Sequence, residues 1–141
     1  MAQLAESKIE TIDLIAVNLY PFVQTVAKEG VTLDDALENI DIGGPSMIRS
    51  AAKNHKFVTV VTEPGQYKRV IEEMKAKDGA VSKELRGDFA RVAFALTASY
   101  DADIAKYLNG MGKEKYPERL SIALKRESLL RYGENPHQKA R

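Results

Sequence analysis

The sequence predicts an α/β fold built on a parallel sheet. Two short runs, 12–19 and 57–62, are rich in apolar and β-branched residues and have the length of buried strands. Segments with helical spacing of apolar residues follow each run. The order strand, helix, strand, helix is typical of a layer of parallel strands with flanking helices.

The first third of the chain divides into short elements. Residues 1–8 are compatible with the tail of a helix, and the apolar run 12–19 predicts a buried parallel strand. Residues 20–28 predict a short helix that Gly30 ends.

Two further short helices precede the second strand. Thr32 and Asp35 are spaced as an approximate capping box, which predicts a helix through Leu37. Pro45 favours a helix start, and we expect a helix over residues 47–53.

Two longer helices are expected after the strand 57–62. Pro64 starts the first, which ends near Gly79. The second begins at Ser82 and is the longest helical pattern in the chain; its apolar or aromatic positions are Leu85, Phe89, Val92, Leu96, Tyr100, Ile104 and Leu108. Residues 113–119 form a polar loop, and 120–124 alternate weakly as a further strand would.

Composition limits the classes of partner. The chain of 141 residues suits one domain, and its net charge of +1, without a basic block, gives no reason to expect a nucleic acid or an acidic membrane as partner. It has no Cys, which excludes disulfides and thiolate metal sites and agrees with a reducing cytoplasmic location. No apolar run approaches the roughly 20 residues that span a bilayer, and we expect no metal site.

The segment 39–46 is the most informative part of the sequence. Asp41, Gly43, Gly44 and Pro45 stand where a helix begins, and bare backbone N–H groups at a helix start can bind an anion or an oxyanion. An ordinary helix start, with the Asp accepting backbone N–H bonds, has the same composition. The residues alone leave both interpretations open.

Four segments together resemble one family. Residues 39–46 (NIDIGGPS) and 51–55 (AAKNH) are similar to its IDIGG and AAKNH segments, and 17–22 (VNLYPF) to its NLYPF segment. Residues 130–138 (LRYGENPHQ) are similar to its LRYGxNPHQ segment. In order and spacing the chain resembles, from about Ile12 to its last residue, the bifunctional purine biosynthesis family. That family joins an IMP cyclohydrolase to an aminoimidazole carboxamide ribonucleotide (AICAR) transformylase.

The resemblance implies an incomplete domain. The family's cyclohydrolase domain is an α/β fold similar to methylglyoxal synthase, and its opening phosphate-binding and KTLHP-like segments have no counterpart here. We therefore expect an internal fragment with a partial parallel sheet, an unpaired strand edge and exposed apolar surface. Residues 1–112 would be the C-terminal part of the cyclohydrolase domain, and 113–141 a linker with the first residues of the transformylase. Alone, the fragment should be inactive.

The resemblance also implies roles in ring closure, the conversion of formyl-AICAR to IMP. Tyr20, Asp41 and Lys53 would be catalytic. Tyr20 would bond the substrate or assist proton movement, Asp41 would orient or deprotonate the attacking carboxamide nitrogen, and Lys53 would stabilise the oxyanion. Asn18 would contact the substrate together with Gly43 and Gly44. From position alone, each has an ordinary structural use as a turn, packing or helix-end residue.

The second activity involves the end of the chain. Arg131, Tyr132 and His137 would contact AICAR, although a charged tail with a turn at 135–136 explains the same residues. Ring closure needs no cofactor, and 10-formyltetrahydrofolate would be the co-substrate of the absent transformylase. The expected partners are a small purine nucleotide precursor and, in the parent protein, a second copy of the chain.

Two questions remain open from the sequence. A straight helix would separate Asp41 from Lys53 by about 18 Å, so a shared site needs an irregular helix start, a long reach by the Lys, or a dimer mate. A non-catalytic nucleotide- or phosphate-binding module of the methylglyoxal-synthase type is the alternative function, and it would not need Tyr20, Asp41 and Lys53 together. His55 is interpreted as a helix-end cap.

Overall fold

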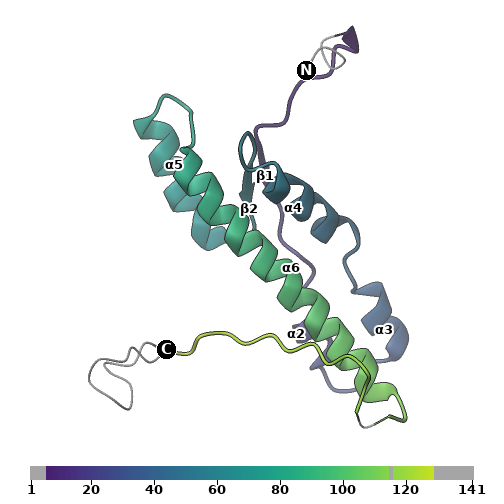
Figure 1. Ribbon diagram of the computed structural model, residues 1–141. Coiled ribbons are helices and arrows are strands. Elements are labelled where there is room, and N and C mark those ends of the chain that lie inside the picture. The colour runs from purple at the N-terminus through teal and green to yellow at the C-terminus, as the bar shows by residue number, and fades with distance from the viewer. Residues whose placement is uncertain (1–5, 115, 129–141) are drawn as a thin grey trace, which may run out of the picture.

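The structure, a computed structural model, describes residues 6–114 and 116–128. It is an α/β fold in which one long helix crosses a two-stranded sheet and the shorter helices (Figure 1). The elements, in chain order, are β1 (Leu14–Ala16), α2 (Phe22–Val26), α3 (Leu33–Glu38), α4 (Gly43–Lys53), β2 (Thr59–Val61), the 3-10 turn η1 (Pro64–Gln66), α5 (Tyr67–Ala76) and α6 (Lys83–Met111). The predicted fold class is confirmed.

The two strands pair in parallel, as the sequence predicts. Leu14 lies opposite Thr59, and Ala16 lies opposite Val61. β2 is buried at all three positions, whereas only Ile15 of β1 is even partly buried. The expectation that β1 is buried is therefore wrong: within the described residues β2 is its sole neighbour in the sheet, so one edge of β1 has no strand beside it.

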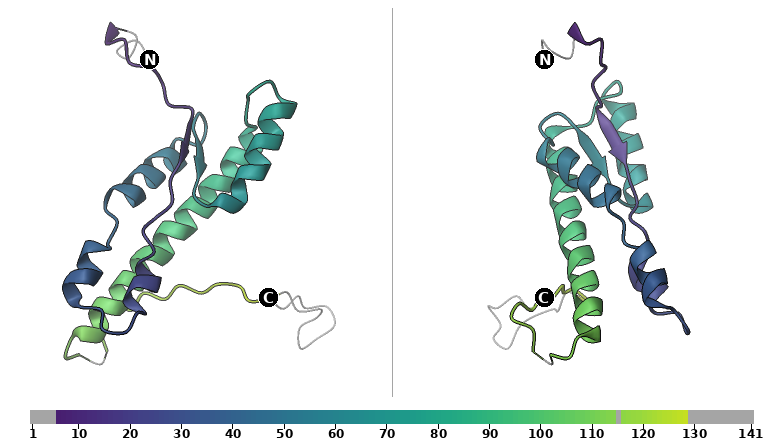
Figure 2. Two further views of the ribbon diagram at one scale, coloured as in Figure 1. Left: turned by 180° about the vertical axis from the view of Figure 1, so that it is seen from behind. Right: turned by 90° about the vertical axis from the view of Figure 1, so that its right-hand side faces the viewer.

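The main core lies between β2, α4, α5 and α6. α4 and α6 pack against each other and against β2, and α5 lies beside the first half of α6 (Figure 2). Val60 of β2, Ile48 and Ala52 of α4, and Phe89 and Ala93 of α6 are at most 1% exposed. The small residues Ala52 and Ala93 let the two helices approach each other and β2 closely.

A second, smaller core joins α2 and α3 to the far half of α6. Phe22, Ala36 and Tyr100 are buried together. The ring of Phe22 packs edge-to-face on Tyr100, with centroids 6.3 Å apart, and on Tyr107 at 5.7 Å. This cluster fixes the segment after β1 against α6.

Side-chain caps fix the helix starts that the sequence indicates. The Thr32 hydroxyl accepts a bond from the Asp35 N–H at 3.1 Å, and Asp35 accepts from the Thr32 N–H, so the predicted capping box is confirmed. Ser82 caps α6 through the Leu85 N–H. Glu73 of α5 accepts bonds from the Ser82 hydroxyl at 2.5 Å and N–H at 2.8 Å, which lowers the pKa of Glu73 to about 2.

One helix start and one expected strand differ from expectation, and a third expectation is largely untested. α4 begins at Gly43 rather than Met47, because the Asp41 carboxylate accepts the Gly44 N–H in the first turn. No strand forms at 120–124, and residues 118–128 are exposed throughout, since no strand edge lies beside this weakly alternating stretch. The expected helix tail at 1–8 falls largely on residues 1–5, outside the described part of the chain.

Apolar side chains remain exposed along several elements. Leu14 of β1, Met47 of α4, Phe57 before β2 and Ile71 of α5 are 37–70% exposed. The expectation of exposed apolar surface on an incomplete sheet is confirmed. No helix in the described ranges is both long and apolar enough to cross a membrane.

Candidate functional site

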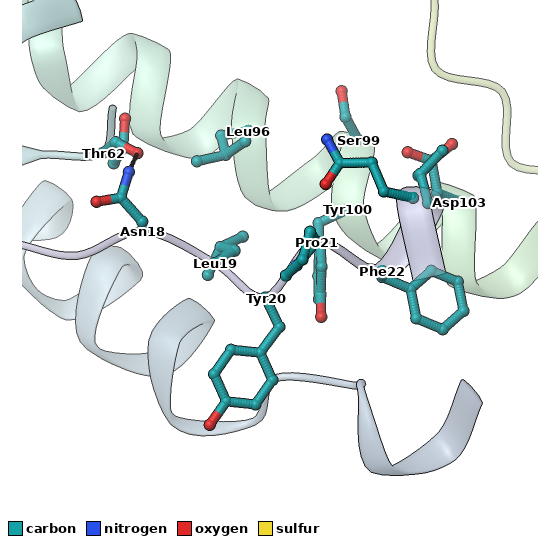
Figure 3. Close-up of a pocket in the computed structure, with 12 residues that line it drawn as sticks. Asn18, Leu19, Tyr20, Pro21, Phe22, Thr62, Leu96, Ser99, Tyr100 and Asp103 are labelled. Carbon is teal, nitrogen blue, oxygen red and sulfur yellow. Dashed lines mark hydrogen bonds between the residues drawn. The ribbon is translucent and has the colours of Figure 1, made fainter. Parts of the chain in front are cut away.

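The carboxyl ends of β1 and β2 meet at the site that the sequence indicates. The Asn18 side-chain N–H donates to the Thr62 backbone carbonyl at 3.1 Å (Figure 3), which ties the two strand ends together. The Thr62 N–H donates in turn to the side-chain amide oxygen (Oε1) of Gln66 at 2.8 Å. Ligands of open parallel sheets bind at this edge of the sheet.

A cavity of about 290 Å³ opens beside these strand ends. The segment after β1 and the middle of α6 form its walls; the lining residues are Asn18, Leu19, Tyr20, Pro21, Phe22, Val23, Gln24, Thr62, Leu96, Ser99, Tyr100 and Asp103. The Tyr20 ring is 55% exposed and points away from Leu96 and Ser99 of α6 (Figure 3). The phenol of Tyr20 is therefore accessible from solvent on the side away from α6.

Asp41 joins the segment after β1 to the start of α4. One carboxylate oxygen accepts the Gly44 N–H at 2.7 Å, and the other accepts the Tyr20 N–H at 3.3 Å. A carboxylate has about four acceptor positions, so both oxygens retain capacity for a further donor. The structure thus joins Tyr20 to the Asp41–Gly44 turn, although Tyr20 and Asp41 are 21 positions apart in the sequence.

The two glycines of the motif differ in their surroundings. A Cβ at Gly44 would lie 2.8 Å from the Asp41 carboxyl carbon, closer than real contacts allow. A Cβ at Gly43 would meet nothing within 4 Å. Gly44 is needed so that Asp41 can approach, whereas the backbone at Gly43 is open for another molecule to approach.

Tyr100 of α6 hydrogen-bonds the backbone of residues 39–41, which precede α4. Its hydroxyl accepts the Asp41 N–H at 2.8 Å and lies 3.3 Å from the Asn39 carbonyl, to which it donates. The side chain is buried, and burial raises the pKa of the Tyr100 hydroxyl above its ordinary value. Tyr100 therefore stays protonated near neutral pH and can make both bonds.

Lys53 lies apart from this group. It is exposed at the last position of α4, which is an uninterrupted helix from Gly43. Ten residues of α-helix span about 15 Å, so the two ends of α4 do not meet. An irregular helix start, which could have brought Asp41 and Lys53 into one site, is therefore absent. His55 contacts the Ala52 carbonyl through Nδ1 at 2.9 Å, which confirms its interpretation as a helix-end cap.

The residues assigned to the second activity, Arg131, Tyr132 and His137, lie outside the described part of the chain. Within residues 6–114 and 116–128, no group of three or more His, Asp or Glu side chains is arranged to hold a metal ion.

Comparison with known proteins identifies the family. The sequence model described as "AICARFT/IMPCHase bienzyme" matches residues 51–141. The chain belongs to this family. The match covers more than half of the chain and includes the end of α4 and the whole of α6.

Members of the AICARFT/IMPCHase family resemble the chain over almost its full length. It is 52% identical over 142 residues to the bifunctional purine biosynthesis protein PurH of Magnetococcus marinus, covering 98% of this chain and 27% of that protein. PurH of Bacillus subtilis is 49% identical over 140 residues, with 99% and 27% covered. The chain thus spans about a quarter of the length of these relatives.

A solved structure shows the same fold. The crystal structure of ForH superposes with a TM-score of 0.70 at 31% sequence identity, covering 80% of this chain and 58% of the ForH chain. The expected α/β class and the family resemblance are both confirmed. The names of the relatives do not favour the alternative of a non-catalytic binding module.

Sequence reasoning missed two contributors to the site. Thr62 directly follows β2, and the rule that parallel strands end at one edge would have paired it with Asn18. The helical spacing of apolar and aromatic residues from Ser82 onward includes Tyr100 as a packing residue. A buried Tyr hydroxyl needs a polar partner, and this was the signal that could have indicated its contact with another segment.

Proposed function

We propose that this chain forms part of an IMP cyclohydrolase site that closes formyl-AICAR to IMP. The observation that carries the proposal is the Asp41 carboxylate, which is held between the N–H groups of Gly44 and of Tyr20, a residue that also lines the cavity at the strand ends. Membership of the AICARFT/IMPCHase family supports the same reaction. Asn18, Tyr20 and Gly43 would contact the substrate at this edge.

The geometry suits the chemistry of ring closure. The carboxamide nitrogen attacks the formyl carbon and loses a proton, the formyl oxygen becomes an oxyanion and then a hydroxyl, and water leaves. Asp41 has free acceptor capacity for the attacking N–H, and its two existing N–H bonds fix its orientation. The exposed Tyr20 phenol would bond the substrate or pass a proton.

We propose that Lys53 acts across a dimer. One α4 helix keeps its two ends about 15 Å apart, and a side chain of four methylene groups does not bridge that span. An exposed Lys53 from a second copy could stabilise the oxyanion at the Asp41 site of the first. The solvent-exposed apolar residues on α4 and β1 supply surface for such a contact.

The remaining proposals concern the longer protein. Residues 1–112 would belong to the cyclohydrolase domain, which α6 ends at Met111, and 113–141 to the linker and the start of the transformylase. Arg131, Tyr132 and His137 would contact AICAR there, with 10-formyltetrahydrofolate as co-substrate. We expect a cytoplasmic enzyme with no cofactor for ring closure.

The test is ring closure by the complete gene product that contains this chain. Asp41→Ala and Lys53→Ala should each lower the rate of IMP formation by at least about 100-fold, the scale of one acid–base or oxyanion contribution. Formyl transfer to AICAR should change much less. A parallel fall of both activities and of the melting temperature would show that the two residues are structural. If the wild-type protein binds formyl-AICAR in a titration but forms no IMP, the result would instead favour a binding module.

The dimer arrangement has its own test. Two inactive variants, Asp41→Ala and Lys53→Ala, are mixed under conditions that exchange subunits. If each site takes one residue from each copy, half of the dimers are mixed and each has one intact site, so roughly a quarter of the wild-type rate should return. No recovery would place both residues on the same copy and refute the arrangement.

A further inference from the structure

We infer that Tyr100 is a positioning residue of the ring-closure site, which holds the Asp41 carboxylate in place through the backbone on both sides of its turn. The inference rests on the proposed function and extends it to a residue on α6, 59 positions from Asp41 along the chain. Tyr100 would not touch the reacting atoms of the substrate.

The bonds of the Tyr100 hydroxyl bracket the turn before α4. It accepts the Asp41 N–H at 2.8 Å and donates to the Asn39 carbonyl at 3.3 Å. One phenol therefore fixes the backbone on both sides of residue 40, and the position of the Asp41 Cα follows. The described residues provide no other bond to the Asp41 N–H.

The ring of Tyr100 fixes the opposite wall of the site. It packs edge-to-face against Phe22, which follows directly on the Tyr20–Pro21 segment, and it lines the cavity (Figure 3). Tyr20 in turn donates its N–H to the Asp41 carboxylate. Tyr100 thus contacts both segments that Asp41 joins, so its loss should loosen the turn and the cavity wall together.

α6 is a rigid support for this purpose. It is a 29-residue helix whose first half packs into the main core beside β2 and α4. Its second half carries Tyr100 to the Asp41 turn. A reacting group misplaced by about 1 Å can lose about 100-fold in rate, so a bond at this distance from the chemistry can affect turnover.

The test compares Tyr100→Phe with Tyr107→Phe in the complete gene product. Tyr107 lies on the same helix and also packs on Phe22, but its hydroxyl has no hydrogen bond within the described residues, which makes it a matched control. Tyr100→Phe should lower kcat for ring closure at least about tenfold with KM nearly unchanged. Tyr107→Phe should keep both constants. Equal kcat values for the two variants would overturn the inference.

A double-mutant cycle separates positioning from general destabilisation. If Tyr100 acts through Asp41, then Tyr100→Phe should cause almost no further loss of kcat when Asp41→Asn is already present. A full additional tenfold loss in that background would show that Tyr100 acts independently of Asp41, against the inference.

Hydrogen exchange gives a readout that does not depend on activity. The Asp41 amide should exchange at least about tenfold faster in Tyr100→Phe than in the wild type, and Tyr107→Phe should leave it unchanged. Unchanged exchange of the Asp41 amide in Tyr100→Phe would show that the Tyr100 hydroxyl does not bond the Asp41 N–H in solution. If the exchange result holds and the wild-type protein fails to close formyl-AICAR, then the proposed function is wrong and the catalytic part of this inference fails with it.

Discussion

The different surroundings of Gly43 and Gly44 allow a test of the Asp41 cap. Both glycines are in the first turn of α4 and neither has a positive φ, so alanine is compatible with the backbone at both. At Gly43 the new Cβ meets open space, and the helix should gain up to about 0.5–1 kcal/mol. At Gly44 the Cβ collides with the Asp41 carboxylate and must displace it.

The magnitude follows from the bond that is lost. The 2.7 Å bond from the Gly44 N–H to Asp41 is charge-assisted and contributes about 1.5–3 kcal/mol. The helix propensity of alanine is common to both variants and cancels in their comparison. Gly44→Ala and Gly43→Ala should therefore differ by about 1.5–3 kcal/mol in the free energy of opening α4.

Hydrogen-exchange mass spectrometry on α4 in the complete gene product measures this difference. Amides in the first half of α4 should exchange roughly 10- to 150-fold faster in Gly44→Ala than in Gly43→Ala. Amides of α5, which does not contact Asp41, provide the internal reference. Equal exchange in the two variants would mean that Asp41 does not cap the helix in solution, and the site as described would be wrong.

Other parts of the chain give further predictions. Glu73→Gln should remove stability that is present above pH 4.5 and is lost as the pH falls toward about 2, because the Ser82 bonds lower the pKa of Glu73; thermal melts of variant and wild type should converge in acid. Arg86→Lys should speed amide exchange in residues 54–58 by roughly 10-fold or more, since the guanidinium donates to the carbonyls of that loop and of Val81. Arg131→Ala should weaken AICAR binding by roughly 1.5–3 kcal/mol in titration calorimetry and spare ring closure; loss of ring closure alone would place the residue in the first site.

Much of the fold could be predicted from local signals. The strand at 57–62, the capping box at Thr32 and the long helix from Ser82 depend on short-range chemistry, and all three are present. The parallel pairing followed from the order of elements. In these cases, local propensity and the global fold agree.

The deviations come from interactions between distant segments. β1 has the apolar composition of a buried strand, but only β2 lies beside it among the described residues, so burial could not follow from composition alone. α4 starts four residues before Met47 because Asp41 caps it. Along α6, the exposed Val92 and the buried Thr97 show that the neighbours α4 and β2 select the buried face, and a sequence pattern does not contain them.

The site was only partly predictable for the same reason. Motif resemblance indicated Asn18, Tyr20 and Asp41, and the fold brings their segments together. Tyr100 contributes through a contact of sequence separation 59, and a local pattern does not identify the partner of its hydroxyl. Lys53 matches its motif but lies at the other end of α4, so its role depends on an arrangement of copies that a single chain does not contain.

The central claim is that the ring-closure site lies at the carboxyl ends of β1 and β2. Locating where the reaction product, IMP, binds tests this claim most directly. Hydrogen exchange of the complete gene product should be measured with and without saturating IMP. We expect slower exchange in residues 18–22 and 39–46, around the Asp41 carboxylate, and no change in α5, which lies away from the cavity. Protection confined to other regions, with residues 18–22 and 39–46 unchanged, would contradict the assignment of this edge of the sheet as the ring-closure site.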